Sequence, residues 1–202
     1  MTTERAATGS RLLLGLIAAG AVAVAAAGWA WFNYGQTYHY AVVQEGVLYR
    51  AGNRSMREFA TACRKTRPKT IVCLLTEREM QREPFIYEAE FCRRNGIRFD
   101  PLAVGRWVTG QDVRRFLQIV SDKENQPVLV HCAQGVRRTG MMVAAYQRSV
   151  LHYDKAKATA AILAFGHKGS VIADLKRFIE AYEDPEHFDL GFPMDPGSPA
   201  EE

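Results

Sequence analysis

The sequence predicts an α/β domain with a central, mostly parallel sheet of four to five strands flanked by helices, preceded by one N-terminal transmembrane helix. Three observations lead to this fold class. Residues 12–32 carry no charged side chain. Short runs rich in β-branched residues then alternate with segments of helical length, which is typical of a parallel sheet. From residue 139 to residue 182 the pattern is helical alone.

The apolar run at residues 12–32 is 21 residues long, enough for a helix to span about 30 Å of hydrocarbon. Arg5 and Arg11 precede it and the next Lys or Arg is Arg50. The positive-inside rule therefore predicts a single-pass membrane protein with residues 1–11 in the cytoplasm and the domain outside it. The alternatives are a cleaved signal peptide with a site near residues 25–27, and a domain that faces the cytoplasm.

The rest of the chain divides by composition. We expect a polar, Tyr-rich connector at residues 33–44, one folded domain at residues 45–183 and a disordered acidic tail at residues 184–202. Between Tyr34 and Glu183 there are 24 Lys and Arg against 15 Asp and Glu. This excess of positive charge suits an anionic ligand or an anionic membrane surface, although a solvated basic face explains it equally well.

The elements of the domain follow in order along the chain. The β-rich runs predict strands at residues 47–50, 70–75, 97–104 and 127–131. Helices are predicted at residues 55–65, 84–95, 111–122, 139–152, 154–165 and 171–182. Two of them begin with a capping pair three residues apart, Ser55 with Glu58 and Thr109 with Asp112, which is a helix start signal.

The stretch VLVHCAQGVRRTGMM, residues 128–142, carries the chemistry. Cys132 directly follows a buried strand, and ligands of open α/β sheets bind at the carboxyl ends of strands. A loop that leads into a helix start presents backbone N–H groups and a favourable dipole to an anion. Gly135 allows a close backbone approach, and Arg138 can offer two parallel donors to a phosphate. The pattern predicts a phosphate site.

The same surroundings favour the thiolate of Cys132 over the thiol, which makes it a candidate nucleophile for covalent phosphoryl transfer. His131 either orients the loop or is a satisfied core histidine. Thr139 is placed to donate a hydrogen bond to the departing thiolate, and it would also serve as an ordinary helix N-cap.

The motif HCAQGVRRTG resembles the signature of the protein tyrosine phosphatase superfamily, in its compact, atypical dual-specificity branch. A looser similarity extends from GVLYRAGNRS to about Tyr182 and includes bacterial membrane-anchored members. The resemblance implies that Cys132 forms a phosphocysteine, that Arg138 binds the phosphoryl oxygens and that no metal or other cofactor is needed. It also implies a phosphate loop, made of Ala133, Gln134, Gly135, Val136, Arg137 and Arg138.

The sequence departs from this family where a general acid is expected. The loop after residues 97–104 reads GRWVTGQD, with no acid before Asp112, which already has a role as a capping partner. Asp100 has a plausible spacing from Cys132 but falls inside a predicted strand. The acid is therefore Asp100, Asp112 or neither, and without one alkyl phosphates would react slowly.

Basic residues at the predicted carboxyl edge of the sheet bear on the substrate. Arg137 lies in the loop itself, and Arg78, Arg82 and Arg106 follow neighbouring strands. They favour an inositol phosphate or phosphoinositide, with a phosphorylated protein as the other substrate and no nucleic acid; the oligomeric state stays open. Two alternative functions are a phosphate-binding pseudophosphatase and a rhodanese-like sulfurtransferase.

Overall fold

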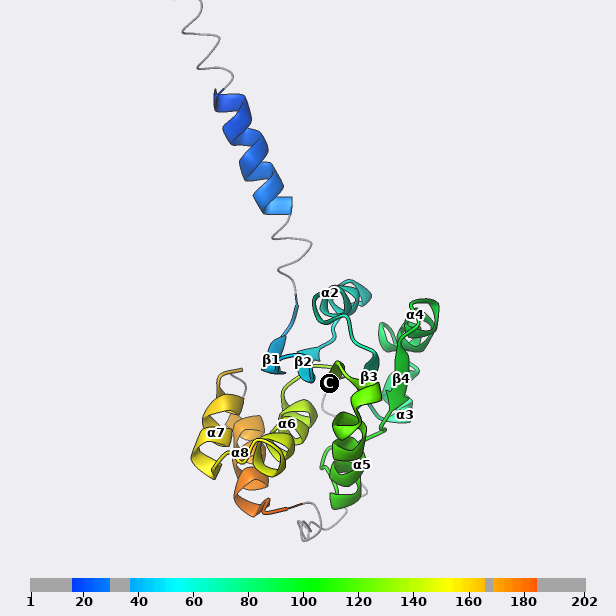
Figure 1. The fold of residues 1–202 in the computed structure, drawn as a ribbon, viewed down its shortest axis with the longest axis vertical. Coiled ribbons are helices and arrows are strands. Elements are labelled where there is room, and N and C mark those ends of the chain that lie inside the picture. The colour runs from blue at the N-terminus through cyan, green and yellow to red at the C-terminus, as the bar shows by residue number, and fades with distance from the viewer. Residues whose placement is uncertain (1–15, 30–36, 166–168, 185–202) are drawn as a thin grey trace, which may run out of the picture. The chain divides into compact units, whose positions relative to one another are not determined.

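The computed structural model describes residues 16–29, 37–165 and 169–184 (Figure 1). The chain divides into two units, Met1–Thr37 and Tyr38–Glu202. In the first unit residues 16–29 are helical. Within the described ranges, no helix combines the length and the apolar character that a membrane crossing requires. Residues 12–15 and 30–32 of the predicted span lie outside the described residues, as do residues 1–11 and 185–202.

The second unit is built on a five-stranded sheet with the order β1-β2-β5-β3-β4. The three pairings among β2, β5, β3 and β4 are parallel, whereas β1 pairs with β2 in the antiparallel sense. The sheet is therefore mixed, and the α/β class is confirmed. The strands are β1 (Ala41–Gln44), β2 (Leu48–Gly52), β3 (Thr70–Cys73), β4 (Arg98–Pro101) and β5 (Val128–Cys132).

Helices cover both faces of this sheet (Figure 1): α2 and α4 lie on one face, and α5 to α8 on the other. A core cluster lies on each face, and every residue of the central strand β5 is buried. The α-helices of the domain are α2 (Met56–Thr66), α3 (Glu77–Met80), α4 (Glu88–Arg94), α5 (Gly110–Ser121), α6 (Arg137–Ser149), α7 (Lys155–Leu163) and α8 (Gly169–Ala181). The described residues also form 3₁₀ turns at Phe85–Tyr87 and Lys123–Asn125.

The helix starts that were predicted from capping residues, those of α2 and α5, are confirmed. The Ser55 side chain accepts from the Glu58 amide at 3.3 Å. Thr109 and Asp112 form both halves of a capping box at the start of α5. A local side-chain hydrogen bond is enough to define these boundaries, because it satisfies amides that the helix itself leaves unpaired.

The elements differ from the sequence-based expectation in several places. The sheet begins at Ala41, inside the predicted connector, because a four-residue edge strand becomes recognisable only when it pairs with β2. The short helix α3 was not expected. Strand β4 ends at Pro101, because its one neighbour, β3, ends at the paired residue Cys73. Helix α6 begins at Arg137, two residues earlier than expected.

Candidate active site

Cys132 is the last residue of β5, between the parallel strands β2 and β3. Its side chain is buried, with an exposed fraction of 3%. The amide of Gly135 donates to its Sγ at 3.2 Å, so the loop curls back over the sulfur. Backbone donors aimed at a sulfur stabilise a negative charge there.

The loop rests on the end of β2. Gly135 has φ +68°, and a Cβ at this position would lie 2.5 Å from the carbonyl oxygen of Ala51 and the amide of Gly52. The amide of Asn53 donates to the carbonyls of Cys132 and Ala133, at 3.2 and 2.9 Å. Only glycine permits this close contact between the two backbones.

Helix α6 starts at the end of the loop with no side-chain cap, because the residue at its N-cap is Val136. The amides of its first turn therefore receive no side-chain cap, an arrangement typical of helix starts that bind anions. Thr139 lies inside the helix and not at its N-cap. It is fully buried, and its hydroxyl has no hydrogen-bond partner among the described residues.

Arg138 is held by Glu79 of α3. Its Nη1 lies 2.6 Å from Glu79 Oε2 and its Nη2 lies 2.6 Å from Oε1, and Nη1 also donates to the carbonyl of Leu74 at 3.0 Å. Burial acts to raise the pKa of the Glu79 carboxyl, but the hydrogen bonds and charge of Arg138 outweigh it and lower the pKa to about 2. The guanidinium is thus held between α3 and the residue that follows β3.

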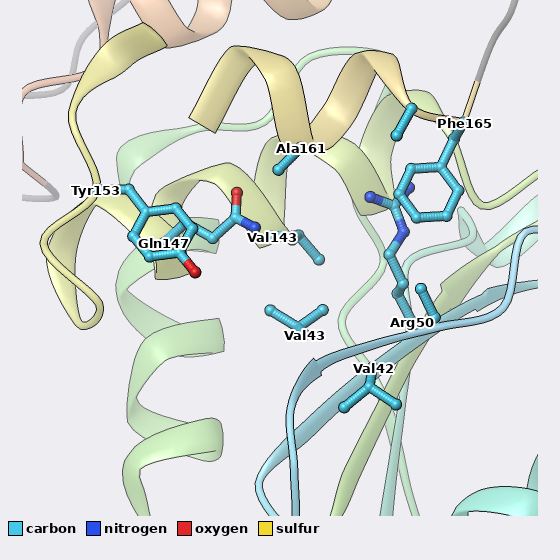
Figure 2. A pocket seen from close by; sticks show the side chains of 10 residues that line it. Val42, Val43, Arg50, Val143, Gln147, Tyr153, Ala161 and Phe165 are labelled. Atoms are coloured by element: carbon cyan, nitrogen blue, oxygen red, sulfur yellow. The ribbon is translucent and has the colours of Figure 1, made fainter. Parts of the chain in front are cut away.

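Arg50 of β2 is a further arginine that contacts the loop. Its Nη2 donates to the carbonyl of Gly135 at 2.5 Å, and its guanidinium carbon lies 3.8 Å from the ring centre of Phe165. Its exposed fraction is 1%, and burial lowers its pKa to about 10. Figure 2 shows this side chain at the wall of a cavity of about 270 Å³, which Val43, Val143 and Gln147 also line.

His131 is buried behind the loop. Its ring packs edge-on against Phe59, with 5.4 Å between the ring centres. Its Nε2 lies 3.4 Å from Oε2 of Glu88, which is itself fully buried. Asn53 donates from its side chain to the other oxygen of Glu88. The histidine thus lies beside a carboxylate.

Neither candidate acid has an unengaged carboxylate. Asp100 lies in β4, two strands from Cys132, and it accepts from Arg115 of α5 at 3.0 Å, with Arg98 Nη2 at 3.6 Å. Asp112 accepts from the amide and hydroxyl of Thr109, both at 2.8 Å. Both carboxylates are therefore paired with neighbouring side chains, and among the described residues neither makes a hydrogen bond or ion pair with the loop after Cys132.

The predicted basic rim divides into two groups. Arg137 and Arg106 approach the same oxygen of Asp174 in α8, at 3.0 and 3.8 Å. That shared carboxylate partly neutralises them. Arg78 and Arg82 are exposed, in and just after α3, beside the residue that holds Arg138.

Four site residues escaped the sequence analysis: Arg50, Asn53, Glu79 and Glu88. Two of them, Arg50 and Asn53, stand in GVLYRAGNRS, a stretch that resembles the same phosphatases, but nothing in it says which side chain reaches the loop. Glu79 carried a weak local signal, since Thr76 and Glu79 form a capping box.

Comparisons with known proteins agree with this geometry. A family model described as "DSP-PTPase phosphatase fused to NAD+ Kinase" matches residues 48–180. Inositol diphosphatase DSP4 of Arabidopsis thaliana is 30% identical over 111 residues, which cover 52% of this chain and 52% of the plant protein. The chain thus spans about half the length of this curated relative.

Two solved structures share the fold. The core catalytic domain of the PP-IP phosphatase SIW14 from S. cerevisiae has a TM-score of 0.56 at 22% identity, covering 71% of this chain and 84% of that one. PTPMT1 in complex with PI(5)P has a TM-score of 0.55 at 17% identity, covering 70% of this chain and 94% of that one. At these identities the likeness concerns the fold alone.

Proposed function

The chain belongs to the family of DSP-PTPase phosphatases fused to NAD+ kinase, and from that membership we propose that it hydrolyses phosphomonoesters through a phosphocysteine intermediate. One observation carries this proposal. The Cys132 sulfur accepts a hydrogen bond from the Gly135 amide, just before a helix that has no side-chain cap at its start. The match to a phosphatase family favours this reaction over a sulfurtransferase.

In the first step the Cys132 thiolate attacks phosphorus, the bond to the leaving oxygen breaks, and this oxygen takes a proton from solvent water. In the second step water attacks the phosphocysteine and gives up a proton to solvent, the sulfur–phosphorus bond breaks, the thiolate is regenerated and phosphate leaves. Loop amides and the Arg138 guanidinium stabilise the charge on the equatorial oxygens. The buried Thr139 hydroxyl is the donor for the sulfur as it departs.

We assign no carboxylate to protonate the leaving oxygen. Asp100 and Asp112 are engaged elsewhere, and Glu79, with a pKa lowered to about 2, is ionised at neutral pH. Substrates with good leaving groups, such as aryl phosphates and pyrophosphates, are expected to react fastest. General acid catalysis is typically worth about 10²–10⁴-fold, so unactivated alkyl phosphates suffer most.

For the substrate class we propose a polyanionic phosphate, such as an inositol phosphate or phosphoinositide. Exposed Arg78 and Arg82 next to the Arg138 site support this choice, as do the plant relative named as an inositol diphosphatase and the SIW14 domain named as a PP-IP phosphatase. A phosphorylated protein is the competing substrate.

The test is metal-free turnover of an aryl phosphate, an inositol pyrophosphate and a phosphotyrosine peptide by the full chain and by Cys132→Ser. We expect the variant to lose turnover and to keep part of its phosphate binding. Unchanged turnover in Cys132→Ser contradicts the mechanism, and a preference for the peptide contradicts the polyanionic substrate. Binding without any release of phosphate by the wild type identifies a pseudophosphatase.

We further propose that residues 12–32 anchor the domain in a membrane with residues 1–11 in the cytoplasm. The charge-free run of 21 residues and the preceding Arg5 and Arg11 support this. Carbonate washing of membranes from cells that express the full chain tests the anchor, because an anchored protein stays in the membrane. The intact mass of the protein shows whether a signal peptide has been cleaved. Protease accessibility of the domain in intact cells tests the orientation.

A further inference from the structure

Behind the phosphate loop lies a buried group of three residues with metal-binding side chains: Cys73, Glu88 and His131. Cys73 and His131 are register partners on the neighbouring strands β3 and β5, so their side chains lie on the same face of the sheet. Glu88 begins α4, which covers that face. Their exposed fractions are 0, 0 and 1%. Two strands and a helix therefore bring a thiol, a carboxylate and an imidazole to one point.

The three donor atoms are spaced as a metal ion requires. Glu88 Oε2 lies 3.6 Å from Cys73 Sγ and 3.4 Å from His131 Nε2, and all three atoms lie within 4.8 Å of one another. Tetrahedral zinc with bonds of about 2.0–2.3 Å sets its ligand atoms roughly 3.3–3.7 Å apart. Two of the three separations already match that geometry.

His131 provides the second, independent sign of a ligand. Neither ring nitrogen has a hydrogen-bond partner among the described residues, although the side chain is buried. A buried polar nitrogen without a partner costs about 1–3 kcal/mol, and such groups are rare in folded proteins. Although Nε2 comes close to Glu88, the contact lacks hydrogen-bond geometry. A metal ion between His131 Nε2 and Glu88 Oε2 would be bound by both atoms.

The outer contacts suit a metal ligand as well. The Asn53 side chain donates to Oε1 of Glu88, leaving Oε2 directed at the sulfur and the imidazole. Ligating carboxylates are commonly oriented by such a hydrogen bond. Burial raises the pKa of two further thiols, Cys63 and Cys92, and the charge of Glu88 adds to this effect.

We propose that Cys73, Glu88 and His131 bind a zinc ion. A thiolate, an imidazole and a carboxylate together are a donor set typical of Zn²⁺, and the ion displaces the thiol proton of Cys73 on binding. The site is separate from the phosphoryl chemistry, which uses the other side of the loop and needs no metal. Because His131 directly precedes Cys132, an ion held there also fixes the backbone that carries the nucleophile.

The test uses the full chain carrying Cys132→Ser, which removes the reactive thiol as a competing ligand. The protein is produced with Zn²⁺ or Co²⁺ supplied during expression, and metal content is measured by mass spectrometry. We expect one metal ion per chain and, with Co²⁺, a thiolate-to-cobalt charge-transfer band. Absence of bound metal, or of the band, overturns the proposal.

Matched variants in the same background locate the site. Cys73→Ser is expected to abolish the charge-transfer band, whereas Cys63→Ala and Cys92→Ala, which remove nearby thiols outside the donor set, leave it unchanged. Asn53→Ala is expected to weaken metal affinity about 10–100-fold. Circular dichroism confirms that each variant is folded. A band that persists in Cys73→Ser, or disappears in folded Cys63→Ala or Cys92→Ala, contradicts the assignment.

Discussion

Arg138 and Glu79 face each other through two parallel contacts of 2.6 Å, one for each nitrogen and oxygen pair. A guanidinium carries five N–H donors, so it can hold this carboxylate and still offer donors to a phosphoryl group. Glu79 therefore acts on the reaction through Arg138, as a positioning residue.

Glu79→Gln is expected to lower kcat/KM by about 10–100-fold, because a charge-assisted hydrogen bond contributes about 1.5–3 kcal/mol. The loss should appear chiefly as weaker inhibition by vanadate and a higher KM, since Arg138 remains but is no longer fixed. Glu77→Gln, on the exposed face of the same short helix, is the control. Equal effects of the two substitutions would contradict a positioning role.

The Glu79 carboxyl also makes stability depend on pH in the acid range. Its folded pKa, about 2, lies below the ordinary value of 4.5, so it stabilises the fold above pH 4.5. That stabilisation is lost as the pH falls from 4.5 towards 2. Urea unfolding at several pH values should show the free-energy difference between wild type and Glu79→Gln shrinking across this window. A constant difference would argue that the carboxylate is not paired.

Gly135→Ala is expected to destabilise the domain by about 1–3 kcal/mol and to reduce turnover by about 100-fold or more. The added Cβ would lie 2.5 Å from the backbone of β2 and force the loop away from it. Gly46→Ala is a matched control, because Gly46 has φ +73° but nothing within 4 Å of a Cβ. Thermal unfolding and kcat are measured for both variants. Backbone strain acts in both, so a larger loss in Gly135→Ala is due to the clash with β2.

Thr139→Val is expected to slow the second chemical step by about 10–100-fold, because the departing thiolate loses its hydrogen-bond donor. Rapid mixing with an aryl phosphate should then show a burst of phenol followed by slow turnover. Thr139→Ser keeps the hydroxyl and should restore single-phase kinetics. A variant that slows the burst itself would place Thr139 in the first step.

Arg50→Met should separate stability from activity. Arg50 is a buried cation whose pKa is lowered to about 10 by desolvation, so an apolar chain of similar length is expected to leave stability unchanged or higher. Turnover should fall about 10-fold, because the Gly135 carbonyl loses its hydrogen-bond donor. Arg54→Met, which breaks an exposed ion pair with Glu58, is the control in both measurements.

Local signals were sufficient for much of the fold. Alternating β-branched runs and capping residues act through neighbours in the chain, so strands β2 to β5 and the starts of α2 and α5 could be predicted. The motif at Cys132 was equally readable, because strand, loop and helix start are contiguous. The edge strand β1 was missed because its four residues are stabilised by pairing with β2.

The amino-acid sequence by itself determined the α/β class, the position of Cys132 at the end of a buried strand and the need for Gly135 and Arg138 after it, because each depends on residues that are adjacent in the chain. Only the tertiary structure decided which partner each carboxylate has. It paired Glu79 with Arg138 across 59 positions, engaged Asp100 with Arg115 and placed Glu88 beside His131. Partners of this kind are set by how strands and helices pack, because a charged side chain interacts through space and not along the chain.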